Sequence, residues 1–302
     1  MNRLSETALA VSSLRSLSDA TLASRKSLYA ALSVVLILVL SPALASAATI
    51  INYGSFMGAT VSYESVREAA NSAGDTAPLF SEPTVIGVPN PVNYPTAPCV
   101  MCAIPGDTLD FDPTGFSASA AAGGVDLTDG NLRFVVKAKP LQTISNIKIS
   151  EFGDTTLIGA GTAATSTFAR IAGVVNIQAV GGIGVNSIPL QFSQTLASFS
   201  LPGGAGVGTP WSGSVLLDLT TANPAVLAAY IVQGLNPALG VTQASVSFDN
   251  TLVATSEVGT SSLIAKKDFG GVIITTNIPE PASCALAIFG LVVGVLASRR
   301  SR

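Results

Sequence analysis

The sequence contains no histidine among its 302 residues, and only 11% of its residues are charged. Histidine is the commonest general base and a common zinc ligand, so its absence excludes every catalytic triad and metal site that depends on imidazole. Aromatic residues make up 6% of the chain. The single tryptophan, Trp211, forms no sugar-stacking platform alone, although Tyr53, Phe56 and Tyr63 could add to a small one. We therefore expect no enzyme, while carboxylate or lysine chemistry stays open.

The N-terminus has the order of features of a secretory signal peptide. A polar, serine-rich stretch ends at Arg25-Lys26, and an apolar run from Leu28 to Leu40 follows. Small residues then surround Ala45 and Ala47, as a signal peptidase requires. We expect residues 1–47 to be removed, with the cut after Ala47 and a second choice after Ala45. Either an extended polar n-region of the signal peptide or a start codon placed too early would explain the long polar stretch.

The C-terminus combines a proline-bracketed glutamate, an apolar stretch and a basic end. Pro279-Glu280-Pro281 precedes residues 282–298, which as a helix would span about 25 Å, the short limit for a bilayer core of about 30 Å. The final arginines favour the cytoplasmic side and predict a transmembrane anchor; they are Arg299, Arg300 and Arg302. The two prolines predict an extended segment outside the membrane that a processing enzyme can reach.

These three features in this order resemble the PEP-CTERM sorting signal, which is also labelled an ice-binding protein C-terminal domain. The resemblance covers residues 279–302 and rests on Pro279, Glu280, Pro281 and the arginine cluster. It implies export across the inner membrane, transient anchoring by the C-terminal helix, and processing by an exosortase, a transpeptidase-like membrane enzyme of Gram-negative bacteria that make exopolysaccharide. Residues 129–154 and 247–269 are similar to uncharacterised ectodomains of other such proteins, which implies a β-rich exported domain and no activity.

The region between the two terminal segments, residues 48–278, is the expected ectodomain, and it is acidic. From Ala48 to Pro281, 16 acidic residues face 8 basic ones, a net charge of −8. This charge argues against nucleic acid and anionic lipid as partners, because the chain cannot neutralise either. The expected partners are signal peptidase, the exosortase and secreted exopolysaccharide, and the expected final location is the cell surface or the extracellular matrix.

Two cysteines of the ectodomain form the sequence Cys99-Val100-Met101-Cys102 within a proline-rich stretch, 89–105. A zinc site needs two further soft ligands, and the third cysteine, Cys284, belongs to the expected anchor. A thioredoxin-like motif needs a helix after its first cysteine, whereas prolines flank this pair. In an exported protein we expect a local disulfide between Cys99 and Cys102. Free thiols and a redox role are the alternatives.

Three closely spaced aspartates, Asp107, Asp110 and Asp112, are the weak candidate for a cofactor site. Carboxylates around a turn can hold Ca²⁺ through oxygen ligands. No glutamate closes the loop at the twelfth position, so the spacing of the helix–loop–helix calcium site is absent. Solvated turn carboxylates are the preferred interpretation, and we expect no cofactor.

Hydrophobic alternation predicts a mainly β ectodomain. In Asn131–Lys139 one face carries Leu, Phe, Val and Ala, and the other carries mostly basic residues. Strands at spacings near ten residues, separated by glycine and asparagine turns, predict a two-sheet β-sandwich of jelly-roll type. One Ala-rich segment, Pro224–Gln233, predicts a short helix capped by Asn223 or Thr221. The other strands are expected at 49–53, 60–63, 108–111, 116–120, 143–151, 165–177, 188–193, 214–219, 241–248, 251–256, 262–267 and 272–276.

Three functions fit these features. The leading hypothesis is an exported structural or binding protein of the surface or matrix, sorted through Pro279–Pro281. The second is a secreted carbohydrate-active enzyme that uses two carboxylates in a cleft. The third is ice binding, although the regular Thr-x-Thr ladders of a flat ice-binding face are missing from the sequence.

Overall fold

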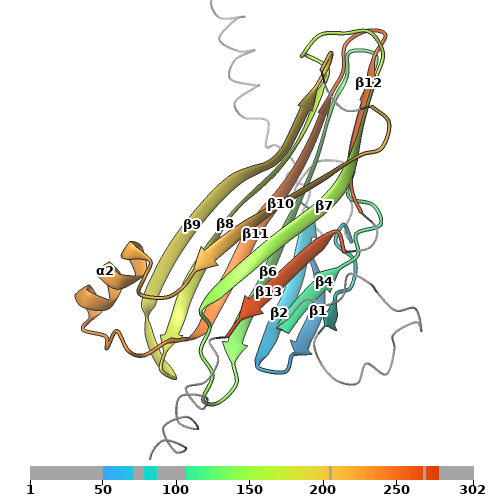
Figure 1. The fold of residues 1–302 in the computed structure, drawn as a ribbon. Coiled ribbons are helices and arrows are strands. Elements are labelled where there is room, and N and C mark those ends of the chain that lie inside the picture. Colours follow the sequence, from blue (N-terminus) through green and yellow to red (C-terminus); the bar gives the residue numbers. More distant parts are fainter. Residues whose placement is uncertain (1–49, 71–77, 87–106, 204–205, 268–269, 279–302) are drawn as a thin grey trace, which may run out of the picture. The chain divides into compact units, whose positions relative to one another are not determined.

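The computed structural model describes residues 50–70, 78–86, 107–203, 206–267 and 270–278. The chain divides into two units, residues 1–47 and 48–302, and every described residue belongs to the second. This second unit is mainly β-structure and consists of two antiparallel sheets that pack face to face (Figure 1). The expected β-sandwich is therefore confirmed.

The first sheet has six strands in the order β1-β2-β6-β11-β8-β9. Its central strand β11 pairs along its length with β6 on one side and β8 on the other. The strands are β1 (Ile50–Met57), β2 (Val61–Ala70), β6 (Val125–Ala138), β8 (Ser166–Val180), β9 (Ile183–Ser200) and β11 (Val241–Thr255).

The second sheet has seven strands and is organised around β7. This strand pairs with β10 along one edge, and along its other edge it pairs first with β13 and then with β12. β4 and β3 extend the sheet beyond β13, and β5 extends it beyond β12. The strands are β3 (Thr84–Ile86), β4 (Asp107–Phe111), β5 (Ser117–Ala121), β7 (Asn146–Ile158), β10 (Thr209–Asp218), β12 (Ser261–Lys266) and β13 (Val272–Asn277).

The core lies between the sheets and follows the alternation read from the sequence. In β6 the side chains of Leu132, Phe134 and Val136 are buried, whereas Arg133 and Lys137 are exposed on the outer face. Because side chains of a strand alternate between faces, the register of β6 fixes which residues of β2 and β11 also point inward.

One strand boundary predicted from the sequence is wrong. Turn-forming Asp249 and Asn250 predict a break between two strands, but β11 runs unbroken from Val241 to Thr255. The alternation continues through the pair, with Phe248 and Asn250 buried and Asp249 on the outer face. Pairing with a strand on each side satisfies the backbone of both residues, which outweighs their local turn preference.

The helix predicted from the sequence is confirmed with the same bounds. α2 spans Pro224–Gln233, and the Asn223 side chain accepts a hydrogen bond from the Ala225 N–H at 3.0 Å. Gly234 ends the helix in a left-handed conformation with φ 65°. Val226 and Tyr230 are buried, and Gln233 exchanges two hydrogen bonds with the backbone of Asn186 in β9, which runs beside the helix (Figure 1).

The described residues contain no helix that is long and apolar enough to span a bilayer. The expected signal peptide, residues 1–47, and the expected anchor, residues 282–298, lie outside the described residues.

Candidate functional site

Most residues that the sequence singles out for sorting and oxidation lie outside the described part of the chain. They are Ala45 and Ala47, Cys99 and Cys102, Pro279–Pro281, and the three terminal arginines. Cleavage, the disulfide and sorting therefore stay predictions.

Asp107, the first of the three candidate calcium ligands, has a structural role in the folded domain. Its buried carboxylate accepts hydrogen bonds from the backbone N–H groups of Ala59, Thr60 and Val61 and from the Thr60 hydroxyl. These donors belong to the turn between β1 and β2, which connects strands of the opposite sheet. Asp107 thus ties one sheet to a turn of the other, and its oxygens are already engaged by donors.

Asp110 and Asp112 lie apart from this arrangement. Asp110 faces away from the core residues Leu109 and Phe111 because neighbouring residues of β4 alternate between faces. Burial, together with the negative charge of Asp112, raises the pKa of Asp110 to about 7. Asp112 accepts a hydrogen bond from the Gly270 N–H at 2.6 Å. No group of three metal-ligating side chains occurs within the residues that the structure describes, so the calcium alternative gains no support there.

The aromatic residues considered for a sugar platform do not form one. Trp211 is 6% exposed and Tyr63 is fully buried, so both belong to the core. Tyr53 is only partly buried, and its hydroxyl donates a hydrogen bond to Glu68 at 2.5 Å. Its phenol is thus engaged with a buried carboxylate.

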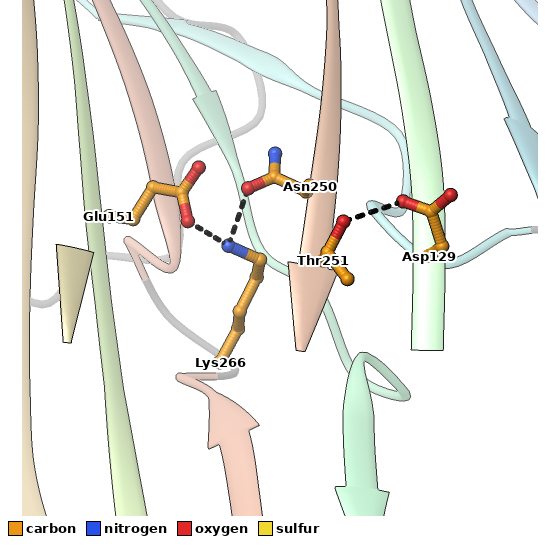
Figure 2. Close-up of polar contacts among 5 residues, drawn as sticks. All are labelled: Asp129, Glu151, Asn250, Thr251 and Lys266. Carbon is orange, nitrogen blue, oxygen red and sulfur yellow. Dashed lines mark hydrogen bonds and ion pairs between the residues drawn. The ribbon is translucent and has the colours of Figure 1, made fainter. Parts of the chain in front are cut away.

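The most unusual feature of the interior is a buried lysine centre, made of Lys266, Glu151 and Asn250 with the rings of Phe116 and Trp211. Lys266 on β12 forms an ion pair with Glu151 on β7, and the two side chains are 0% and 1% exposed. Its Nζ also donates to Asn250 Oδ1 on β11 at 3.1 Å. Figure 2 shows the Lys266 amino group between the Glu151 carboxylate and the Asn250 carboxamide. The centre therefore links the two sheets.

Aromatic rings cover the Lys266 amino group. The Nζ atom lies 5.1 Å from the centre of the Phe116 ring and 5.7 Å from that of Trp211. Trp211 and Lys266 are the two cross-strand neighbours of Gly153, one on each side of β7. A Cβ at Gly153 would lie 2.4 Å from the indole and 2.1 Å from the Ala265 carbonyl oxygen, so only glycine lets the ring approach.

Burial shifts the pKa values of both ionisable groups of the lysine centre toward their neutral forms. Burial raises the pKa of Glu151, and the charge of Lys266 and contacts with Lys266 and Asn250 oppose that rise. Burial likewise lowers the pKa of Lys266, against the opposing effect of Glu151. Among the described residues, Glu151 Oε1, Asn250 Nδ2 and Trp211 Nε1 are buried without a hydrogen-bond partner. Native proteins leave few such atoms, so three in one cluster require an explanation.

Sequence reasoning did not identify this centre, although part of the signal was present. Alternation through Phe248, Asn250 and Leu252 would have placed Asn250 on the core face, had β11 been predicted as one strand. Alternation also separates Lys266 from Lys267, whose amino group pairs with Asp154 at the surface. Lys266, Glu151 and Asn250 come together because β12 pairs with β7 and both pack against β11. The alternation pattern of a sequence does not show which strands are neighbours, so it could not predict this contact.

A separate polar contact lies on the outer face of the first sheet, next to Asn250 in the sequence. Thr251 follows Asn250 in β11 and points the opposite way, and its hydroxyl donates to Asp129 on β6 at 3.1 Å (Figure 2). The outer face of this sheet also carries four exposed basic residues; they are Arg67, Arg133, Lys137 and Arg170. Arg67 and Arg133 are directly opposite one another across β2 and β6.

Three shallow hollows on the described surface are lined without carboxylates. One hollow of about 460 Å³ lies at the end of β6 beside the β8–β9 turn, and Lys137 and Gln243 are among its lining residues. A second, of about 440 Å³, contains Phe168 and Arg170 on β8. No Asp or Glu lines these two hollows or a third between β5, β7 and β12.

Comparison with known proteins identifies no family. No protein-family model and no curated protein matches the chain. Among solved structures, tailspike protein 4 of bacteriophage CBA120 is 13% identical, over 77% of this chain and 20% of its own, with a TM-score of 0.21. TmCBM61, solved with β-1,4-galactotriose, is 8% identical over 57% and 71%, with a TM-score of 0.19.

A family 12 xyloglucanase from Bacillus licheniformis is 9% identical, over 76% of this chain and 100% of its own, with a TM-score of 0.19. The chain spans about a fifth of the length of the tailspike protein that it matches. At these TM-scores the similarities carry no argument about fold or activity.

Proposed function

We propose that this chain is an exported structural or binding protein of the cell surface or extracellular matrix, which an exosortase recognises through Pro279-Glu280-Pro281. One observation carries the proposal: the folded domain lies between the two expected processing points. β13 ends at Asn277, and the sorting motif begins two residues later. β13 lies inside its sheet, paired with β4 and β7, so the domain is closed before the motif begins.

The N-terminal side supports the same proposal. β1 begins at Ile50, three residues after Ala47, the residue expected to precede the signal-peptidase cut. β1 pairs with β2 through residues from Ile50 to Met57 and needs no residue before Ile50 for this pairing. Removal of 1–47 and of the C-terminal tail would therefore leave every described strand intact.

The ectodomain is the part of the chain that we propose to lie at the cell surface, and its strand order supports a jelly-roll-like fold. Consecutive strands change sheet repeatedly, as in β5 to β6, β6 to β7 and β7 to β8. We infer from these crossings a jelly-roll-like sandwich, the finer form of the architecture. Secreted exopolysaccharide is the proposed partner, and the polar outer face of the first sheet, with its exposed arginines and Lys137, is the surface proposed to meet it.

The enzyme alternative receives no specific support from the described residues. A two-carboxylate glycosidase needs its acids about 5–10 Å apart across a cleft. Here Glu68 accepts hydrogen bonds from Tyr53 and from the Leu79 and Phe80 N–H groups, Asp107 binds a turn, and Glu151 lies in the core. Ice binding also stays without a specific observation, and a thermal-hysteresis measurement would test it.

The sorting proposal is tested by replacement of Pro279, Glu280 and Pro281 with alanine in a host that has an exosortase. We expect C-terminal trimming and surface delivery to fall at least tenfold, because the extended recognition element is lost. Pro237→Ala, at an exposed position after α2, is the matched control and should be trimmed normally. Unchanged trimming and delivery of the triple variant would contradict the proposal.

A further inference from the structure

The lysine centre brings an amine, a carboxamide and a carboxyl group together in the core. Lys266 Nζ lies 3.1 Å from Asn250 Oδ1. Since a C=O bond is about 1.2 Å long, the carboxamide carbon lies at most about 4.3 Å from the amine. Reacting atoms in productive complexes are typically about 3–3.5 Å apart, so a small side-chain movement would bring the two into contact. The same Nζ contacts Glu151.

Burial makes each of the three groups chemically suited to react. A lysine is a nucleophile only when its amine is neutral, and desolvation favours that form. Desolvation also favours a protonated Glu151, which can then donate a proton. In addition, Asn250 Nδ2 has no partner among the described residues, and Figure 2 shows it pointing away from Lys266.

We propose that Lys266 and Asn250 become joined by an amide bond that the folded chain forms itself, with Glu151 as the catalytic residue. This inference concerns the ectodomain alone and does not depend on the sorting signal. It requires no cofactor, oxidant or other enzyme.

The proposed reaction is a transamidation in which atoms and charges balance. One proton first passes from the Lys266 ammonium group to the Glu151 carboxylate, which leaves an amine and a carboxyl group. The amine lone pair then forms a bond to Asn250 Cγ, and the bond from Cγ to Nδ2 breaks. Glu151 gives its proton to the departing nitrogen and receives one from the attacking nitrogen. The products are a secondary amide, one ammonia molecule and a protonated Glu151.

Formation of the amide would remove the buried charges and the unpartnered nitrogen that destabilise the lysine centre. A buried ion pair rarely stabilises a fold more than apolar residues would, because both charges must be desolvated. The amide is neutral, and the unpartnered Asn250 nitrogen leaves as ammonia. The bond would join β12 of one sheet to β11 of the other, under the rings of Phe116 and Trp211.

Peptide mapping of the full chain tests the proposal directly. After unfolding in urea, an endopeptidase that cuts after glutamate separates residues 152–257, which contain Asn250, from the peptide that begins at Val258 and contains Lys266. We expect one joined species, lighter than the two peptides together by about 17 Da, the mass of ammonia. Two separate peptides of unmodified mass from a chain that unfolds cooperatively would overturn the proposal. A loss of 18 Da would also overturn it, because water would then have left a carboxyl group.

Variants separate the role of each group. Lys266→Arg keeps the charge but cannot form the amide, and Glu151→Gln keeps the shape but cannot exchange the proton. We expect the joined species to disappear in the first and to fall at least a hundredfold in the second. Lys267→Arg, at the neighbouring half-exposed lysine, is the control and should retain the bond. A joined species that persists in Lys266→Arg would refute the assignment, and the unmutated chain decides the matter if a variant does not fold.

Discussion

At the scale of single residues, burial gives the acidic side chains of this domain distinct roles. Asp107 and Glu68 accept hydrogen bonds from backbone N–H groups and so hold segments of the chain in place. Glu151 faces a lysine in the core. Asp110 is 5% exposed, and its Oδ1 has no hydrogen-bond partner among the described residues. Asp110 is therefore expected to weaken the fold when it is charged.

Asp110→Asn should change how stability depends on pH. The pKa of Asp110 is about 7 in the folded chain against 3.8 in a model compound, so the folded state binds the proton more tightly. The contribution of Asp110 to stability is then fully present below pH 3.8 and is lost as the pH rises through about 7. We expect the variant to be more stable than the parent at pH 8 by about 2 kcal/mol, after allowance for solvent screening, and not at pH 4.

Urea unfolding at both pH values measures this difference. Glu82→Gln, at an exposed acid, tests whether loss of any one charge has the same effect. An equal difference between Asp110→Asn and the parent at pH 4 and pH 8 would rule out the proposed titration.

The separation of Asp107 from Asp110 could have been predicted only in part. The predicted strand 108–111 begins directly after Asp107, and only an extension of that strand by one residue places Asp107 and Asp110 on opposite faces, since they are an odd number of residues apart. The partners of Asp107 could not have been predicted, because the turn at Ala59–Val61 is 46 residues or more away along the chain.

At the scale of the elements, β7 and its neighbours position the lysine centre. Trp211 on β10 and Lys266 on β12 flank Gly153 of β7, and the indole occupies the space where a side chain would lie. The sequence predicts a strand over 143–151, which ends before Gly153, but β7 continues to Ile158. Gly153 allows the indole to pack closely and does not form a turn. The sequence alone cannot show this, because it does not reveal which strands lie next to β7.

Gly153→Ala should destabilise the domain by about 2–3 kcal/mol, because the new methyl group would overlap the indole and the Ala265 carbonyl. The urea midpoint reports the loss of stability, and the fluorescence emission of Trp211 reports the displacement of its indole. Gly115→Ala is the matched control, since nothing lies within 4 Å of its added Cβ. If the two variants had the same stability and the same emission, the close packing of Trp211 on Gly153 would be wrong.

Strand existence was more predictable than strand extent. Alternation and turn residues indicate β6, β8 and β13 near their observed positions. The three-residue strand β3 was not predicted, because it is too short to show a period. β9 extends well beyond its predicted core at 188–193, because pairing with β8 continues to Ser200.

At the scale of the whole domain, polar contacts join the two sheets at separate places along the core. The Tyr63 hydroxyl on β2 donates to the Asp107 carbonyl at 2.9 Å. The hydroxyls of Thr155 on β7 and Thr167 on β8 are 2.8 Å apart. An amide between Lys266 and Asn250 would add a covalent link that closes a loop of about 16 residues, worth about 3 kcal/mol through the unfolded state. Such a link would stabilise the domain in the extracellular location that we propose for it.

The termini of the natural protein test the central claim most directly. The chain should be recovered from the surface or matrix of its host and its terminal peptides identified by mass spectrometry. We predict an N-terminus at Ala48, or at Ser46 for the alternative cut, and a C-terminus that lacks the arginines from Arg299 onward. A chain found in the cytosol with Met1 or its neighbouring residues and Arg302 still present would contradict the account.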